Sequence, residues 1–231
     1  SEVKTLGGVA DFSLGNFGFV MVGQSVPVIR TSSCIANPDA PLGSAPAPTI
    51  ITHSDATPCI HGPNLPTTTY GVSTALQMPF GMRFSARGEY LGGHYIYDGA
   101  AFNGITRGIR WPGCYEFYRL QEAGQVSQAK NIDVARCTQS IARSDFFIYP
   151  SDFFKIRDMT FSVPIPTKYL RGASAGSLTL GAHNFWRWLN DGFPVFDPET
   201  GNNDGFNSDV RSILEHVPPP ATYTASIRIT F

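Results

Sequence analysis

The sequence predicts an all-β fold, a segment of an antiparallel transmembrane β-barrel with about seven strands. Only 15% of the 231 residues are charged, against about 25% in a typical soluble domain, while Gly, Pro and Phe are abundant. Several stretches alternate apolar and polar residues with the period of a β-strand. The connections between these stretches alternate between short and long, which is typical of a barrel with short periplasmic turns and long extracellular loops.

The clearest strand pair lies within residues 67–93. In its first half Tyr70, Val72 and Leu76 alternate with small or polar residues, and the second half repeats this pattern from Phe80 onward. The segment MPFG between the halves leaves room only for a tight turn around Pro79. We therefore expect two antiparallel strands joined by a short turn.

Five further stretches are predicted as strands from the same alternation. They cover residues 5–14, 17–30, 151–166, 176–189 and 221–231. The predicted connections are short near Asn16, near Pro79 and at 165–176, and long at 31–67, 94–151 and 190–221. No run of apolar residues reaches the roughly 18 to 20 that a transmembrane helix needs.

The four cysteines fall in two of the long connections. Cys34 and Cys59 lie in the first, and Cys114 and Cys137 in the second, which suggests two loop-closing disulfides in an oxidising compartment. Four free thiols remain the alternative. No Cys-x-x-Cys motif occurs and the histidines are scattered, so no metal site is expected.

In this interpretation the two faces of each strand contact different surroundings. Apolar faces point to lipid and polar faces to the lumen, and aromatic residues near strand ends form girdles at the membrane interfaces. The core of a soluble β-sandwich is the alternative for the same aromatics. The residues in question are Tyr70, Tyr90, Trp186, Trp188 and Tyr223.

Charged residues on the predicted strands are expected to face inward, because a charge against lipid is costly. Arg83, Arg87, Glu89 and Arg228 are such residues, and they are candidates for contact with a ligand or a plug domain. A solvated wall without specific contacts is the alternative. Arg87 and Glu89 could also pair with each other or with the neighbouring strand.

Several function classes are disfavoured by what the sequence lacks. No phosphate-binding loop, nucleophile elbow, zinc-protease helix or paired-carboxylate motif occurs, so we expect neither an enzyme nor a cofactor. The net charge of −1 without a basic run argues against nucleic acid as a partner.

The loop at 197–209 is rich in oxygen ligands but lacks the spacing of an EF-hand. Calcium binding is one interpretation of this loop, and a turn built from Asx residues and Gly is the favoured one. Its candidate residues are Asp197, Glu199, Asn202, Asp204 and Asp209.

Several segments in order resemble the C-terminal third of SusC/RagA-type TonB-dependent outer-membrane receptors. Residues 62–99 resemble a glycine-proline entry to a strand, residues 151–166 a later strand, and residues 178–199 a segment with the Asn184–Phe185 and Phe196–Glu199 elements. Like those receptors, the chain finishes on a strand ending in Phe231, and Val22–Pro27 is a weaker likeness. The cysteine pairs and residues 94–151 depart from the family pattern.

The resemblance implies that residues 1–231 are the C-terminal portion of a receptor barrel, without the plug domain and the N-terminal strands. Such barrels have about 22 strands, so another chain or further N-terminal sequence is expected to complete this one. The expectation is a receptor divided at an extracellular loop, by cleavage or as a split gene. The expected location is the bacterial outer membrane, with long loops extracellular and the C-terminus periplasmic.

The implied function is TonB-dependent uptake of a nutrient such as an oligosaccharide or a peptide. The implied partners are the N-terminal part of the receptor, TonB through that part, a surface lipoprotein and the lipid bilayer. Two rival functions stay open: a structural barrel in a surface assembly, and a secreted glycan-binding β-sandwich.

The resemblance also suggests roles for aromatic and terminal residues. Trp111, Tyr115, Tyr118 and Trp186 could stack on sugar faces, with girdle or loop-core positions as the alternative. The last strand carries an expected signal for the outer-membrane assembly machinery, formed by Tyr223, Ile227, Ile229 and Phe231.

Overall fold

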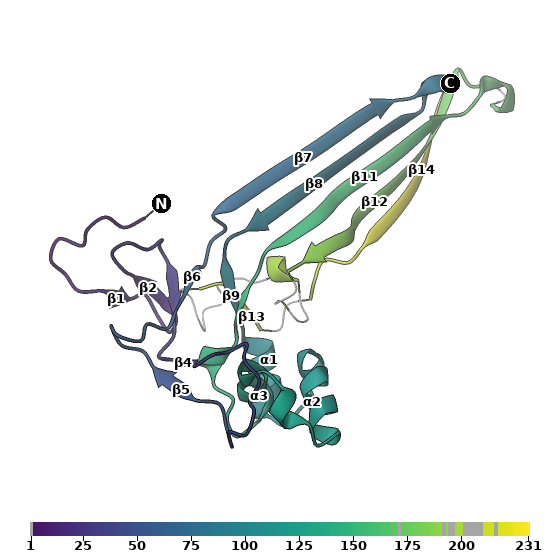
Figure 1. Ribbon diagram of the computed structural model, residues 1–231. Helices are drawn as coiled ribbons and strands as arrows, with labels where there is room; N and C mark the ends of the chain where they lie inside the picture. The colour runs from purple at the N-terminus through teal and green to yellow at the C-terminus, as the bar shows by residue number, and fades with distance from the viewer. Residues whose placement is uncertain (1, 171, 191–192, 194–196, 201–209, 215–216) are drawn as a thin grey trace. The chain divides into compact units, whose positions relative to one another are not determined.

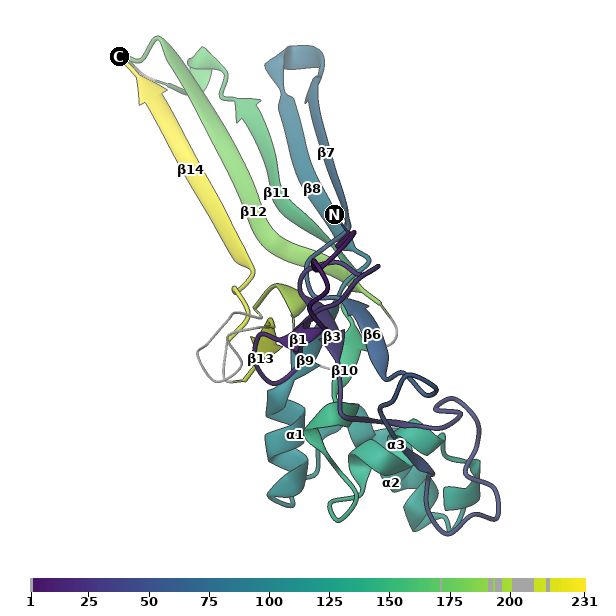
Figure 2. The same cartoon turned by 90° about the vertical axis from the view of Figure 1, so that its left-hand side faces the viewer.

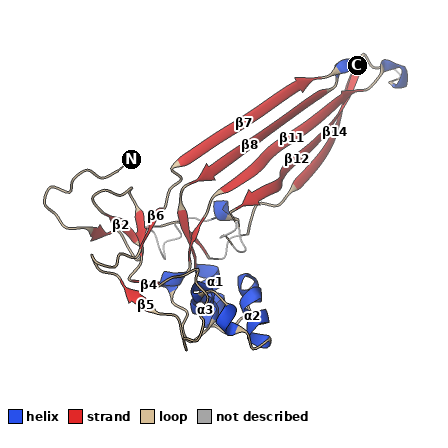
Figure 3. Cartoon of the chain, in the orientation of Figure 1, coloured by secondary structure: helices blue, strands red, loops and turns tan. Residues whose placement is uncertain are grey.

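A computed structural model describes residues 2–170, 172–190, 193, 197–200, 210–214 and 217–231. The chain divides into two compact units. The sheet unit comprises Thr68–Gly92, Asp152–Leu189 and Pro218–Phe231, and the disulfide unit comprises Ser1–Thr67, Gly93–Ser151 and Asn190–Val217. Figure 3 shows long strands in the former and short strands with helices in the latter.

The sheet unit is one antiparallel sheet of five long strands in the order β14-β12-β11-β8-β7 (Figures 1 and 2). The strands are 9 to 15 residues long, enough for a tilted strand to cross a bilayer. They are β7 (Thr68–Gln77), β8 (Arg83–Gly92), β11 (Phe153–Pro164), β12 (Ala175–Leu189) and β14 (Thr222–Thr230). These are the strands that the alternation predicted.

The connections of the five strands show the predicted alternation of short and long. Short 3-10 turns, η1 (Pro79–Gly81) and η5 (Thr167–Tyr169), join β7 to β8 and β11 to β12. At the other end of the sheet Thr68 pairs with Gly92, and Phe153 with Leu189. All three segments of the disulfide unit therefore connect to the sheet at this one end, called the loop end below, and the short turns mark the turn end.

The pairing register sorts the side chains of the sheet unit onto two faces. Val72, Gly88, Ile156 and Trp186 form one cross-strand row, and every other row on that face is also apolar or small. The opposite face alternates with it and carries the charged residues and hydroxyls. The apolar-face residues are Tyr70, Val72, Thr74, Leu76, Phe84, Ala86, Gly88, Tyr90, Phe154, Ile156, Met159, Phe161, Val163, Leu178, Leu180, Ala182, Trp186, Trp188, Tyr223, Ala225, Ile227 and Ile229.

The disulfide unit contains three small sheets. Their strand orders are β1-β2-β3-β6, β10-β9-β13 and β4-β5. The strands are β1 (Phe12–Ser13), β2 (Gly18–Val20), β3 (Val28–Arg30), β4 (Ser33–Ile35), β5 (Ile50–Thr52), β6 (Ile60–Pro63), β9 (Tyr95–Asp98), β10 (Ile148–Pro150) and β13 (Ser212–Ile213).

Three helices, α1 (Gly99–Thr106), α2 (Tyr115–Glu122) and α3 (Asn131–Cys137), lie in the connection that the sequence predicted as one long loop. Asp98 starts α1 as its N-cap, with Oδ1 accepting a hydrogen bond from the Ala101 N–H at 2.9 Å. Within the described residues, no helix combines the length and the apolar character needed to cross a membrane. The short 3-10 turns of the unit are η2 (Pro112–Cys114), η3 (Val126–Gln128), η4 (Ser144–Phe146) and η6 (Pro198–Thr200).

One buried side chain joins the three chain segments of the disulfide unit. Asn64 is 2% exposed, and its Nδ2 donates to the Tyr95 carbonyl at 3.0 Å. Its Oδ1 accepts from the Arg211 N–H at 2.9 Å. Because these three residues come from three separate segments, the amide acts as a junction that the spacing in sequence does not reveal.

The two N-terminal strands predicted for the barrel are wrong. Residues 5–14 contain only the two-residue β1, and residues 17–30 split into β2 and β3, which pair with each other. Gly23, with a φ of 80°, and Pro27 interrupt this run, so it cannot form one strand of about ten residues. The sheet unit therefore has five strands rather than about seven, and among the described residues it is open rather than a closed barrel.

Candidate functional site on the two-faced sheet

The centre of the polar face holds a chain of three polar side chains across three strands. Arg87 on β8 and His183 on β12 both lie opposite Asp158 on β11. Arg87 Nη2 donates to Asp158 Oδ2 at 2.8 Å, and His183 Nδ1 lies 2.7 Å from Asp158 Oδ1. The pairing with the neighbouring strand that the sequence left open is therefore the one observed for Arg87.

A second ion pair depends on a β-bulge. Between Ile156 and Asp158 the register shifts, so Arg157 is an extra residue relative to β8. Strict alternation would have placed Arg157 on one face and Asp158 on the other. Instead Arg157 reaches Glu89 Oε2 through Nε at 3.1 Å and Nη2 at 2.8 Å, with its side chain only 16% exposed. Counted from Ile156 on the apolar face, strict alternation would place Asp158 on that face too, and the bulge keeps this charge off it.

The turn end of the polar face has cations without acids. Arg83 lies opposite Gln77 and Ser162, and Arg228 lies opposite Ser177. Both side chains are exposed, and neither makes an ion pair or hydrogen bond within the described part of the chain. Thr179 and Ser162 lie between them, with Thr179 donating to Ser162 at 3.1 Å, and Ser85 and Thr160, 2.6 Å apart, form the next polar row toward the loop end.

Aromatic side chains gather on the apolar face near the loop end. Tyr70 and Tyr90 pair in register with ring centroids 6.1 Å apart, and Phe154 meets Trp186 edge-on at 6.0 Å. Tyr223, near the start of β14, lies on the same face opposite Ala182. In the pairing register Tyr70, Tyr90, Phe154 and Trp188 form one row, and Tyr223 lies two apolar rows nearer the turn end, in the row of Met159.

The residues proposed from sequence as ligand contacts are divided between several places. Arg83, Arg87 and Glu89 lie on the polar face, whereas Trp186 lies on the opposite face and cannot contact the same ligand. The remaining three belong to the disulfide unit: Trp111, Tyr115 and Tyr118.

Around α2 these three aromatics have different roles. The Tyr118 hydroxyl accepts a hydrogen bond from the Trp111 N–H at 3.3 Å, and its ring faces the Arg110 guanidinium at 4.7 Å. Trp111 lines a cavity of about 300 Å³ together with Cys114 and Arg136. Tyr115 is 60% exposed and is the one with most surface free for a ligand.

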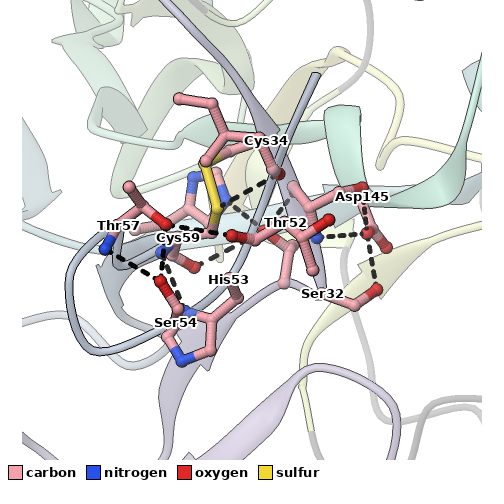
Figure 4. Close-up of a disulfide and its surroundings, with 12 residues drawn as sticks. Ser32, Cys34, Thr52, His53, Ser54, Thr57, Cys59 and Asp145 are labelled. Carbon is pink, nitrogen blue, oxygen red and sulfur yellow. Dashed lines mark hydrogen bonds between the residues drawn. A yellow bond between two sulfur atoms is a disulfide. The ribbon is translucent and has the colours of Figure 1, made fainter.

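The structure joins both cysteine pairs, Cys34–Cys59 and Cys114–Cys137, as disulfides. Figure 4 shows the first, where the His53 ring accepts a hydrogen bond from the Cys59 N–H at 2.9 Å. The second links the start of α2 to the end of α3. Each bridge lies within one segment of the disulfide unit.

Asp145 anchors β4 beside the first disulfide. Its Oδ2 accepts hydrogen bonds from Ser32 Oγ at 2.7 Å, Ser33 N–H at 2.8 Å and Ser33 Oγ at 2.7 Å (Figure 4). Three donors on one oxygen stabilise the buried carboxylate. The contact ties the first segment of the disulfide unit to the second.

A cavity of about 440 Å³ in the disulfide unit was not foreseen from the sequence. Its wall includes Tyr95, Tyr149 and Arg136, and Arg136 is held by the carbonyls of Phe146 and Ile148. Burial lowers the pKa of His61, which also lines the cavity, to about 4, so the imidazole is neutral at pH 7. No sequence signal places these residues together, because they come from β6, β9, α3 and β10.

Among the residues that the structure describes, no group of three or more His, Cys, Asp or Glu side chains is placed to hold a metal ion. Asp197 makes a turn instead: its Oδ1 accepts from the Glu199 N–H at 3.0 Å, and Thr200 Oγ1 donates to its carbonyl at 2.7 Å. Asn202, Asp204 and Asp209, the other predicted members of this loop, lie outside the described residues.

The residues of the expected assembly signal share the apolar face of β14. Tyr223, Ile227 and Ile229 alternate along it, and Ile227 is 66% exposed. Phe231 follows the strand and is 87% exposed. The four therefore present a continuous apolar strip at the edge of the sheet.

Comparison with known proteins gives a likeness of fold. No protein-family description matches the chain, and no curated protein matches it. Among solved structures, that of the RagAB peptide transporter matches 99% of this chain with a TM-score of 0.66 at 13% identity. The RagAB peptide importer matches in its 'open-open' state with a TM-score of 0.59 at 14% identity, and in its 'closed-closed' state with 0.61 at 13%.

Each of these matches includes 99% of this chain but only 25% to 26% of the longer transporter chain. It therefore spans about a quarter of the length of the transporter chains it is similar to. At this identity the likeness concerns the fold, and it agrees with the high β-strand content of the chain.

Proposed function

We propose that this chain is part of an outer-membrane receptor that imports a nutrient, with the sheet unit as one sector of its barrel wall. The observation that carries the proposal is the division of the sheet into an exposed apolar face and a charged polar face. On the apolar face Tyr70 is 69% exposed, Leu180 47% and Ile227 66%. An apolar surface of this extent is stable in contact with lipid, whereas the polar face requires a water-filled lumen.

The open edges of the sheet support further strands. Among the described strands, β7 and β14 each pair on one side only. In hydrocarbon, an unpaired row of N–H and C=O groups costs several kcal/mol per group. We therefore infer that additional strands, from an N-terminal part of the receptor, complete the barrel, and that the plug domain and the TonB contact belong to that part.

We propose peptides as the imported class, because the solved structures that this chain resembles include those of the RagAB peptide transporter. Oligosaccharides are the second candidate class. On this proposal the disulfide unit lies outside the cell, where Trp111, Tyr115 and Tyr118 contribute to capture together with a surface lipoprotein. Arg83, Arg87 and Glu89 line the passage, Trp186 belongs to the girdle, and the strip from Tyr223 to Phe231 serves assembly.

The two alternative functions, a secreted β-sandwich and a structural barrel, predict different properties for the same sheet. A secreted β-sandwich would cover the apolar face with a second sheet, yet Tyr70 and Ile227 remain largely exposed. A structural barrel in a surface assembly would keep the two-faced sheet but would not transport.

Two measurements on cells that carry the native gene test the proposal. The chain should sediment with outer membranes and resist extraction without detergent, and deletion of its gene should abolish uptake of a fluorescent peptide mixture. Recovery in the detergent-free soluble fraction would support the sandwich. Membrane location with unchanged uptake of both peptides and oligosaccharides would support the structural barrel, and loss of oligosaccharide uptake alone would reassign the substrate.

A further inference from the structure

The strands of the sheet unit have an excess of positive charge, with six Lys or Arg residues against two acidic residues. The sheet unit contains eight Lys or Arg residues and only three acidic residues. The cationic residues are Arg83, Arg87, Lys155, Arg157, Lys168, Arg171, Arg187 and Arg228, and the acidic residues are Glu89, Asp152 and Asp158.

The acidic residues of this unit are already engaged. Glu89 pairs with Arg157, and Asp158 pairs with both Arg87 and His183. Asp152 accepts a hydrogen bond from the Tyr90 hydroxyl at 3.0 Å. Each of the three carboxylates therefore has a partner. The exposed guanidinium groups of Arg83 and Arg228, in contrast, have no partner within the described part of the chain.

The surface around Arg83 and Arg228 suits an anion. Their cross-strand neighbours are Gln77, Ser162 and Ser177, which are neutral and can donate hydrogen bonds. A guanidinium binds a carboxylate through two parallel hydrogen bonds, and hydroxyls can satisfy its remaining lone pairs. The exposed aromatic rings of the sheet strands, such as Tyr70 and Trp186, lie on the opposite face.

We propose that this polar face, and Arg83 with Arg228 in particular, selects substrates that carry carboxylates, so that acidic peptides are the preferred substrates. The inference rests on the proposed function in uptake, because it takes the polar face to line the passage. A lumen wall with one sign of charge concentrates substrates of the opposite sign and repels those of the same sign. Basic peptides are therefore disfavoured on the same surface.

The test measures uptake by cells of three fluorescent peptides of equal length, one acidic, one neutral and one basic. Rates are divided by the amount of receptor in the outer membrane. Wild type should import the acidic peptide fastest. In the double variant Arg83→Gln/Arg228→Gln we expect the ratio of acidic to neutral uptake to fall about tenfold, and the variant Arg83→Lys/Arg228→Lys should retain most of that ratio.

Lys168→Gln is the matched control, since it removes a cation of the same unit from the turn rather than from a strand. It should leave the ratio unchanged. If the double variant fails to accumulate, the two single variants test the proposal, each with a smaller fall in the ratio. Equal loss for all three peptides, or no charge preference in wild type, would overturn the inference, whereas a wild type that imports no peptide would overturn the proposed function itself.

Discussion

The disulfide unit and the sheet unit obtain their stability from different sources. The disulfide unit contains both disulfides, the three α-helices found among the described residues and a core of fully buried side chains such as Phe147, Ile96 and Val28. The sheet unit contains no cysteine, and many of its large apolar side chains, such as Val72 and Ile227, are exposed. One chain thus combines a unit that buries its apolar surface internally with a unit whose apolar surface needs an external apolar partner.

The two units also carry net charges of opposite sign. The disulfide unit has nine Lys or Arg residues against fifteen acidic residues, whereas the sheet unit has eight against three. The net charge of −1 hides this asymmetry, because the two contributions nearly cancel. The lesson is that a whole-chain charge excludes a partner class only if the charges are evenly distributed.

The largest effect is expected when a disulfide is removed from the disulfide unit, which tests whether the two units are stabilised separately. In Cys34→Ala/Cys59→Ala, which opens a bridge with a sequence separation of 25, we expect the disulfide unit to lose about 3 to 4 kcal/mol. Hydrogen exchange of the detergent-solubilised chain, followed by peptide, should speed up in β4 and β5 and stay unchanged in β8 and β11. Equal acceleration in both units would show that they do not unfold separately.

The second test places the same charged side chain on either face of the sheet. Leu180→Arg places a charge on the apolar face in the middle of β12, and we expect a cost of about 3 kcal/mol if that face meets lipid. Thr179→Arg, its neighbour on the polar face, is the matched control and should cost little. The measurement is the fraction of folded protein in outer membranes, and equal effects of the two substitutions would contradict the assignment of the faces.

The third test uses the pH response of the disulfide unit. Burial lowers the pKa of His61 to about 4 from 6.5, so its contribution to the free energy of unfolding rises as pH increases through that window. Burial raises the pKa of Asp98 to about 6 from 3.8, so its contribution falls over nearly the same window.

When one of these two groups is removed, the pH dependence of the free energy of unfolding should follow the other group alone. In Asp98→Asn we expect the free energy of unfolding of this unit to rise by about 2 kcal/mol more than in wild type between pH 4 and pH 6.5. Hydrogen exchange at the two pH values, corrected for intrinsic rates, gives the comparison. His61→Gln should change the pH dependence in the opposite direction, and identical pH profiles for all three proteins would refute the assignment.

The smallest expected effect concerns the junction within the disulfide unit. Asn64→Ala leaves the Tyr95 carbonyl and the Arg211 N–H without their partner, which should cost about 1 to 2 kcal/mol. The loss should appear in β9 and β13, which belong to different segments, and not in the sheet unit. Gln121→Ala, at an exposed position of α2, is a control for the substitution by alanine itself.

Much of the sheet unit could be predicted because its signals are local. The alternation in β7, β8, β11, β12 and β14 has the period of a strand, and the same alternation assigns Arg83, Arg87 and Glu89 to one face. The bulge could not be predicted, because the alternation alone gives no reason to place Arg157 beside Glu89. The ion-pair partners of Arg87 likewise depend on the register between strands.

The disulfide unit was harder to anticipate, because its contacts join distant segments. Its strands are two to four residues long, too short for a periodic pattern, and its helices are seven or eight residues long. The cavity around His61 and Arg136 and the three-segment junction at Asn64 arise only when those segments meet. The failure at residues 17–30 has the same origin, since short strands that pair locally imitate one long interrupted strand.

By itself the sequence determined the long strands, their two faces and the cysteine pairs, because each follows from spacing along the chain. Only the tertiary structure decided how many of those strands share one sheet, which carboxylates are already paired and which arginines are left among hydroxyls. These depend on register and on contacts between residues far apart in sequence, and such contacts are fixed by the packing of the whole chain rather than by any local pattern.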